Sequence, residues 1–280
     1  MKKLLSIIVV AVLCSFASQK SKISPKGTLF IIGGGHKDEH LMGALVQVAQ
    51  LSSKDYIMIL PMASTLPEES VEDMVKQLKE VTKNKVTGIN FSKSDAENKR
   101  LVDSVRRAKL IYITGGDQNR FMSIVEHTAL FDAIHAAYQQ GACIAGTSAG
   151  AAIMSETMIT GNQLKDSTYR PTFNRLEHKN LETAKGLGLI KSAIIDQHFV
   201  KRSRYNRLFT ALAEFPDKTC IGIDEGTAII VRQNTIKVVG ESQVIVAKNP
   251  RGLKKKSNGL ITWDNLTLSA YDEGKMFKLK

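Results

Sequence analysis

The segment Gly141–Ile153, with the sequence GACIAGTSAGAAI, constrains the fold of this chain more than any other stretch. A short apolar run ends at the glycine-bracketed sequence GTSAG, and a small-residue segment compatible with a helix follows. This order predicts a strand, a tight turn and a helix start, with Ser148 at the apex of a nucleophile elbow. There the serine hydroxyl stands at the carboxyl edge of a sheet, where backbone N–H groups can stabilise an oxyanion. A chance match in a loop or a phosphate-binding turn is the alternative interpretation.

Apolar runs alternate with amphipathic stretches through the first two thirds of the chain. Strands are predicted at residues 27–32, 56–60, 86–91, 110–113, 142–145 and 193–195, and helices at 41–51, 68–81, 95–108, 130–140 and 202–215. This alternation predicts an α/β three-layer sandwich with a mostly parallel central sheet and helices on both faces. Short strands follow from about residue 219, which predicts a β-rich C-terminal extension of the same domain. The polar segment 159–188 is predicted to be irregular, and loops of this length are usually either functional lids or disordered.

The N-terminus has the pattern of a secretory signal peptide. Lys2 and Lys3 precede an apolar stretch of about a dozen residues, and the small residues Ser15 and Ala17 stand at the −3 and −1 positions of the expected cleavage point. The stretch is too short to span a bilayer stably, so we predict a signal peptide at 1–18, a linker at 19–26 and a single α/β domain at 27–280. Export is therefore expected. A lipoprotein acylated at Cys14 is the alternative. It is less favoured because Leu13 precedes the cysteine, where a small residue is usual.

Composition and charge limit the classes of ligand. The formal net charge is +12, but the basic residues are scattered and aromatic content is 6%, which does not favour nucleic-acid binding. Anionic substrates fit this distribution better. No ligand set completes the cluster of acids and histidines at residues 36–40, and the glycine run at 33–35 lacks a dinucleotide or Walker pattern, so neither a metal nor a cofactor is predicted. Cys143 and Cys220 are predicted to be buried free thiols.

A serine nucleophile needs a base and an acid that orients the base. His198 is the one histidine that directly follows a predicted strand, so we predict that it meets Ser148 at the carboxyl edge of one sheet. The acid candidates are Glu156, Asp166, Asp196, Asp224 and Glu225. Asp166, which lies between nucleophile and base in the chain, is the first choice, and Glu156 is the second.

The predicted strand 110–113 opens into the sequence TGGDQN at residues 114–119. A glycine pair at the carboxyl end of a central strand is a place where open α/β sheets bind ligands. Its N–H groups can supply a second oxyanion donor, and Gln118 can hydrogen-bond a substrate. The alternative is a simple helix N-terminus capped by Asp117.

Four segments in this order resemble the cyanophycinases, within the serine-peptidase family that also holds dipeptidase E. They are TGGDQ at 114–118, GTSAG at 146–150, DQHF at 196–199 with arginines at 202, 204 and 207, and GIDEGTA at 222–228. The resemblance spans residues 27 to about 246. The DQHF and arginine segment distinguishes the cyanophycinases from the dipeptidase E relatives, which share the elbow but lack the arginines. The segment after the elbow is several residues longer here than in typical members.

The resemblance implies a fold similar to class I glutamine amidotransferases, which is flavodoxin-like, and a homodimer. It also implies hydrolysis of cyanophycin, a polyaspartate with arginines on its β-carboxyls, to β-Asp-Arg dipeptides. On matching positions Ser148 is the nucleophile, His198 the base, and Gly116 and Ala149 the oxyanion donors. The residues implied to line the substrate site are Asp117, Gln118, Asp196, Gln197, Arg202, Arg204 and Arg207. Guanidinium groups bind the α-carboxylates of such a substrate bidentately.

Four other functions compete with this interpretation. An exported isoaspartyl or α-aspartyl dipeptidase is the alternative within the family. An α/β-hydrolase esterase would place its histidine near the chain end and carry an HGGG-type loop, and a glutamine amidotransferase would need cysteine in place of Ser148. A peptide-binding relative with a dead site is the non-enzymatic alternative.

Overall fold

The computed structural model describes residues 25–279 apart from 167, 169 and 171. The predicted signal peptide and most of the predicted linker therefore lie outside the described residues. Within them, no helix is both long and apolar enough to cross a membrane.

The central sheet confirms the predicted α/β class. Its strand order is β16-β11-β10-β1-β5-β4-β2-β3. The parallel strands are β1 (Thr28–Ile32), β2 (Tyr56–Leu60), β3 (Lys85–Gly88), β4 (Leu110–Ile113) and β5 (Cys143–Thr147). β10 (Thr227–Arg232), β11 (Thr235–Gly240) and β16 (Met276–Lys278) extend the sheet in antiparallel fashion. The continuous burial of β1, β4 and β5 explains their unbroken apolar sequences, because helices cover both faces.

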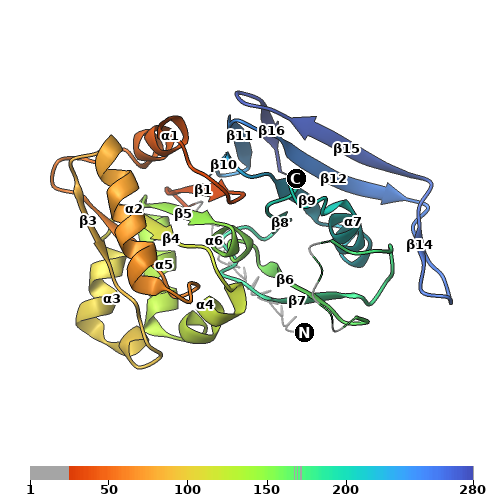
Figure 1. Cartoon of the computed structure of the whole chain (residues 1–280), viewed down its shortest axis with the longest axis horizontal. Helices are drawn as coiled ribbons and strands as arrows, with labels where there is room; N and C mark the ends of the chain where they lie inside the picture. The colour runs from red at the N-terminus through yellow and green to blue at the C-terminus, as the bar shows by residue number, and fades with distance from the viewer. Residues whose placement is uncertain (1–24, 167, 169, 171, 280) are drawn as a thin grey trace, which may run out of the picture.

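The helices form the two outer layers (Figure 1). α1 (Glu39–Ala49) and α2 (Pro67–Val81) pack on one face, and α3 (Lys99–Arg106), α4 (Gln118–Val125) and α5 (Ala129–Gln140) pack on the other. The single helix predicted at 95–108 is divided into the 3₁₀ turn η1 (Asp95–Glu97) and α3. The division arises because the Asn98 side chain accepts from the N–H groups of Arg100 and Leu101 and so starts a new helix.

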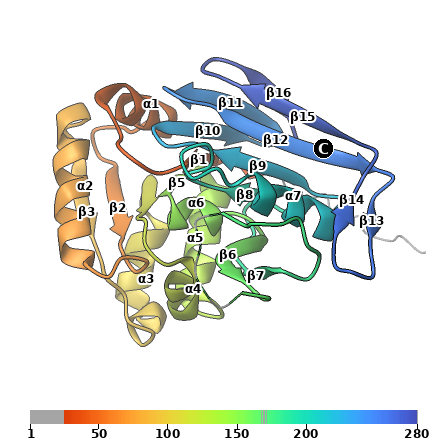
Figure 2. The same cartoon turned by 45° about the vertical axis from the view of Figure 1, so that its right-hand side comes forward.

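A second sheet lies beside the first (Figure 2). Its order is β15-β12-β9-β8, built from β8 (Ala193–Asp196), β9 (Thr219–Ile223), β12 (Val244–Arg251) and β15 (Asn265–Tyr271). β8 and β9 are parallel, and α7 (Tyr205–Glu214) packs on this sheet through a core that includes Phe199 and Leu208. The expectation that the strand before His198 joins the central sheet is therefore wrong. A strand's hydrophobic pattern identifies the strand but does not identify its partner.

The segment 159–188 contains regular structure that its polar sequence did not indicate. β6 (Thr157–Gln163) and β7 (Leu181–Lys185) form an antiparallel ribbon. Between them the chain is tied to the hairpin of β13 (Lys254–Lys255) and β14 (Ile261–Thr262), because His178 N–H donates to Gly259 O and Ile261 N–H donates to Leu176 O. The side chain of Phe173 is buried against the α7 core. A partly exposed ribbon lacks the alternation that identifies a strand from sequence.

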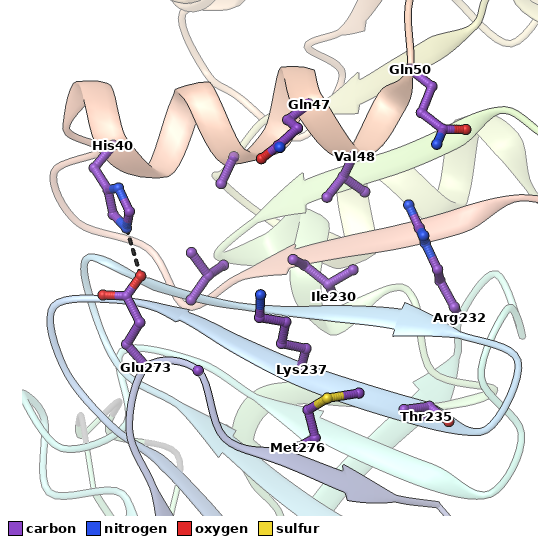
Figure 3. Close-up of a pocket in the computed structure, with 13 residues that line it drawn as sticks. His40, Gln47, Val48, Gln50, Ile230, Arg232, Thr235, Lys237, Glu273 and Met276 are labelled. Carbon is purple, nitrogen blue, oxygen red and sulfur yellow. Dashed lines mark hydrogen bonds and ion pairs between the residues drawn. The ribbon is translucent and has the colours of Figure 1, made fainter.

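A surface pocket of about 540 Å³ lies between α1 and the antiparallel edge of the central sheet (Figure 3). His40 Nε2 lies 2.6 Å from Glu273 Oε1 at one end, and Arg232 Nε donates to Thr28 Oγ1 at the other. None of the site residues predicted from the sequence lines this pocket.

Candidate active site

The ends of three strands bring Ser148, His198 and Glu225 together. Ser148 follows β5 directly, and the other two lie two residues beyond β8 and β9. Because β8 and β9 are parallel, with Asp196 opposite Gly222, His198 and Glu225 leave the same edge of the second sheet.

The glycine turn after β1 joins this edge to the central sheet. His198 N–H donates to Gly33 O at 2.7 Å. A Cβ atom on Gly33 would lie 2.1 Å from Asp224 O, so the backbones approach as closely as glycine alone allows. The site is therefore formed at the junction of the two sheets.

The three side chains form a continuous hydrogen-bonded chain. Ser148 Oγ lies 2.8 Å from His198 Nε2, and His198 Nδ1 lies 2.6 Å from Glu225 Oε1. The carboxylate accepts, so Nδ1 carries the proton and Nε2 is left to accept the serine proton. The imidazole is 11% exposed and the Glu225 side chain 29% exposed. This is the arrangement of nucleophile, base and orienting acid that acyl-transfer enzymes use.

Two of these residues have backbone conformations that L-residues rarely adopt. Ser148 has φ 53° and ψ −110°, and His198 has φ 47°. Each costs about 1–3 kcal/mol, so the surrounding structure must hold them. Ser148 N–H donates to Ile32 O at 3.1 Å, which anchors the elbow to β1. Ser148 thus lies at a sharp turn between β5 and α6 (Ala149–Ala152), a helix of only 4 residues.

Burial lowers the pKa of His198 below its ordinary value, because desolvation disfavours the imidazolium. The hydrogen bond that Nδ1–H donates to Glu225 opposes this effect and raises the pKa, whereas the positive charges of Arg202 and Arg204 lower it further. The imidazole is therefore kept neutral and able to act as a base near neutral pH.

The glycine turn after β4 lies against the nucleophile. A Cβ atom on Gly115 would lie 3.3 Å from Ser148 Cβ. Gly116 has φ +135°, and a Cβ there would lie 2.0 Å from Ala63 O, so a side chain would not fit. Asp117 N–H donates to Ala63 O at 2.8 Å and fixes the turn. The structure thus brings Gly115 against Ser148, and Gly116 is the next residue of the same turn. The oxyanion role of Gly116 and Ala149 stays a prediction.

The sequence-based choice of Asp166, or else Glu156, as the orienting acid was wrong. Asp166 accepts from Thr168 N–H at 2.9 Å and from Arg170 Nε at 3.4 Å, and Glu156 contacts Lys218 Nζ at 3.4 Å. Glu225 is the carboxylate at His198. It follows β9 by two residues, so the rule that identified His198, a residue just beyond a strand end, would also have selected it.

The three arginines of the 202–207 segment do not share one environment. Arg202 is exposed, whereas Arg204 and Arg207 are each 2% exposed. Arg207 contacts Asp196, and Arg204 contacts Gln197. Only Arg202 of the three is exposed, because Arg204, which precedes α7, and Arg207, within α7, point into the protein. The implied contact of all three with a substrate stays a prediction.

The remaining predicted substrate residues have partners within the protein. Asp117 caps α4, since its carboxylate accepts from Asn119 N–H at 2.7 Å, which is the alternative considered for it. Gln118 Nε2 donates to Ile159 O at 2.9 Å and to Thr160 O at 2.6 Å, so it ties α4 to β6.

Cys143 and Cys220 are free and buried, as predicted. Burial raises the pKa of the Cys143 thiol to about 12 and also raises the pKa of the Cys220 thiol. Among residues 25–279 other than 167, 169 and 171, no group of three histidine, cysteine or acidic side chains is placed to hold a metal ion.

The chain resembles known peptidases over most of its length. The model of peptidase family S51 matches residues 29–239. A cyanophycinase from Nostoc sp. is 32% identical over 237 residues, which cover 81% of this chain and 76% of that protein. A peptidase E from Actinobacillus pleuropneumoniae is 27% identical over 163 residues, covering 55% of this chain and 64% of that protein. The crystal structure of a peptidase from an acI-B1 Actinobacterium superposes with a TM-score of 0.67 at 21% identity, over 91% of this chain and 98% of the other. The chain therefore belongs to peptidase family S51 and is a serine peptidase.

Proposed function

We propose that this enzyme degrades cyanophycin to β-Asp-Arg dipeptides through an acyl-enzyme on Ser148. The hydrogen-bonded chain from Ser148 through His198 to Glu225 is the observation that supports the chemistry. The cyanophycinase relative at 32% identity over 81% of the chain supports the substrate.

The geometry supports a two-stage reaction. Ser148 Oγ attacks the scissile carbonyl carbon while its proton passes to His198 Nε2, and the N–H groups of Gly116 and Ala149 stabilise the oxyanion. The imidazolium returns the proton to the leaving amine, and the acyl-enzyme remains. A water molecule then gives a proton to His198 Nε2 and attacks the ester carbonyl carbon. The bond to Ser148 Oγ breaks, the acid product leaves, and Oγ takes the proton back from the imidazolium. Glu225 remains ionised throughout and stabilises the imidazolium.

Arg202 is the guanidinium group that we propose for substrate recognition. It is exposed, and its backbone N–H donates to His198 O at 3.1 Å, so it lies beside the base in the fold. A planar guanidinium binds a substrate α-carboxylate through two parallel hydrogen bonds, which lysine cannot reproduce. Replacement by lysine is expected to raise KM for the polymer about tenfold or more, with a smaller effect on kcat.

Product analysis tests the proposed substrate. The purified protein is incubated with insoluble cyanophycin and, separately, with free isoaspartyl and α-aspartyl dipeptides, and products are identified by mass, with Ser148→Ala as the control. Release of β-Asp-Arg dipeptides from the polymer is expected. Cleavage of the free dipeptides without any release from the polymer would instead establish the exported aspartyl dipeptidase. Failure of the wild-type protein to react with a fluorophosphonate probe would favour the non-catalytic peptide-binding alternative.

We further propose that the enzyme is exported after cleavage near Ala17 and acts as a homodimer. The export proposal rests on the sequence of residues 1–18. Two measurements test export: the N-terminal sequence of the mature protein and the cell fraction in which it is found. A lipid-modified Cys14 at the new N-terminus would show that the protein is a lipoprotein.

The homodimer rests on the family resemblance, and light scattering of the mature protein tests it.

A further inference from the structure

Helix α7 holds the end of β8 through a buried ion pair. Arg207 Nε donates to Asp196 Oδ2 at 2.8 Å, and Arg207 Nη2 donates to the other carboxylate oxygen. The two residues are 2% and 1% exposed. Such a bidentate pair fixes both the distance and the relative orientation of the elements that carry it.

A second arginine on the same side of the turn holds the next residue. Arg204 Nη1 donates to the backbone oxygen of Gln197 at 2.7 Å and to its side-chain Oε1 at 2.8 Å, and it lies 3.8 Å from Asp196 Oδ1. Gln197 N–H also donates to Asp196 Oδ1 at 2.8 Å. The two residues that immediately precede His198 are therefore fixed by side chain and by backbone.

This bracing acts where the backbone is strained. His198 has φ 47°, which an unsupported histidine would leave. After His198 the chain reverses, with Arg202 N–H donating to His198 O at 3.1 Å and Arg204 N–H donating to Phe199 O at 3.0 Å. Loosening either arginine releases the turn at the residue whose imidazole must remain 2.8 Å from Ser148 Oγ.

We propose that Arg204 and Arg207 are positioning residues that hold the His198 imidazole on Ser148 through Gln197 and Asp196 and do not contact the substrate. The proposal rests on the catalytic roles given above to Ser148 and His198. It leaves Arg202 as the arginine of this segment that recognises the substrate.

Replacement of each arginine by lysine tests the proposal, because lysine keeps the charge and loses the planar fork. Arg204→Lys and Arg207→Lys are compared with Arg175→Lys, which changes an exposed arginine outside the site. Two rates are measured: labelling of Ser148 by a small, uncharged fluorophosphonate, and hydrolysis of cyanophycin. Thermal unfolding shows that each variant is folded.

A displaced imidazole is expected to lower the labelling rate and kcat together, by about tenfold or more, while KM changes less than about threefold. The probe has no carboxylate, so a slower reaction with it reports on Ser148 and His198 alone. Arg175→Lys is expected to label at the wild-type rate. A pH titration of labelling adds a second readout, since Arg204→Gln removes a positive charge near His198 and is expected to raise its apparent pKa.

A wild-type labelling rate in both lysine variants overturns the proposal. A wild-type labelling rate together with a raised KM for cyanophycin would show that the two arginines bind the substrate. Should Arg207→Lys fail to fold, Gln197→Leu is a milder variant. It removes one acceptor of Arg204, so its labelling rate and KM test the Arg204 contact in the same way. If the wild-type protein labels but leaves cyanophycin intact, the proposed substrate fails while the positioning test still stands.

Discussion

The carboxylate of Glu225 lies 2.6 Å from Nδ1 of His198, and the two residues are 27 positions apart in the chain. They meet because each lies two residues past the end of one of two adjacent parallel strands, β8 and β9. The acid that contacts His198 therefore follows helix α7 in the sequence and does not lie in the segment between Ser148 and His198.

Glu225→Gln is expected to lower kcat by about 10²- to 10⁴-fold, because the amide neither fixes the productive tautomer nor stabilises the imidazolium. The rate of fluorophosphonate labelling should fall with it. Asp166→Asn provides the comparison, since this side chain contacts Thr168 and Arg170 and is expected to leave both rates unchanged. If Asp166→Asn were the damaging change, the assignment of the acid would be reversed.

Two substitutions of Ser148 separate chemistry from strain. Ser148→Ala and Ser148→Gly both remove the nucleophile, so neither is expected to label or to turn over substrate. Since the position has φ 53° and ψ −110°, glycine relieves strain that alanine retains. Glycine also lowers the stability by adding entropy to the unfolded chain. With this cost included, the free energy of unfolding of Ser148→Gly should exceed that of Ser148→Ala by about 1 kcal/mol in denaturant unfolding. Equal stabilities would show that the strain at Ser148 is no larger than the entropy that glycine adds.

The pH dependence of kcat/KM reports the pKa of His198 in the free enzyme. Catalysis needs the neutral imidazole, so activity is lost as pH falls through this pKa. Burial lowers the pKa below its ordinary value of 6.5, and the acid limb is expected below that pH. Arg202→Gln removes a positive charge and should move the limb upward, whereas Glu225→Gln removes a group that raises the pKa and should move it downward. Shifts of the opposite sign would contradict this account of the site's electrostatics.

Gly34→Ala is expected to inactivate the enzyme by displacing the base. Gly34 has φ +114°, and a Cβ atom there would lie 2.4 Å from His198 Cε1. The imidazole must move, so labelling and kcat should fall by about 10²-fold or more. Gly43→Ala is the matched control, because nothing lies within 4 Å of its Cβ position in α1. It should retain full activity and gain about 0.5–1 kcal/mol of stability, since alanine favours a helix.

Local patterns predicted the central elements well. β4 falls on its predicted bounds at Leu110–Ile113, and α5 begins one residue before its predicted start, because buried strands and amphipathic helices leave distinct periods in the sequence. The same patterns failed for β6 and β7, whose ribbon is polar and partly exposed, and for the division of the 95–108 helix by the Asn98 cap.

The sequence by itself singled out Ser148, because its glycine-bracketed turn is encoded within a few neighbouring residues. It also singled out His198, which the structure places in contact with Ser148, because that residue follows a strand directly. Only the tertiary structure decided that Glu225 is the third member and that Arg204 and Arg207 turn inward. The physical reason is that strand pairing and helix rotation depend on packing between distant segments. Parallel pairing of β8 with β9, and the burial of one face of α7, place these side chains, and no local pattern records either contact.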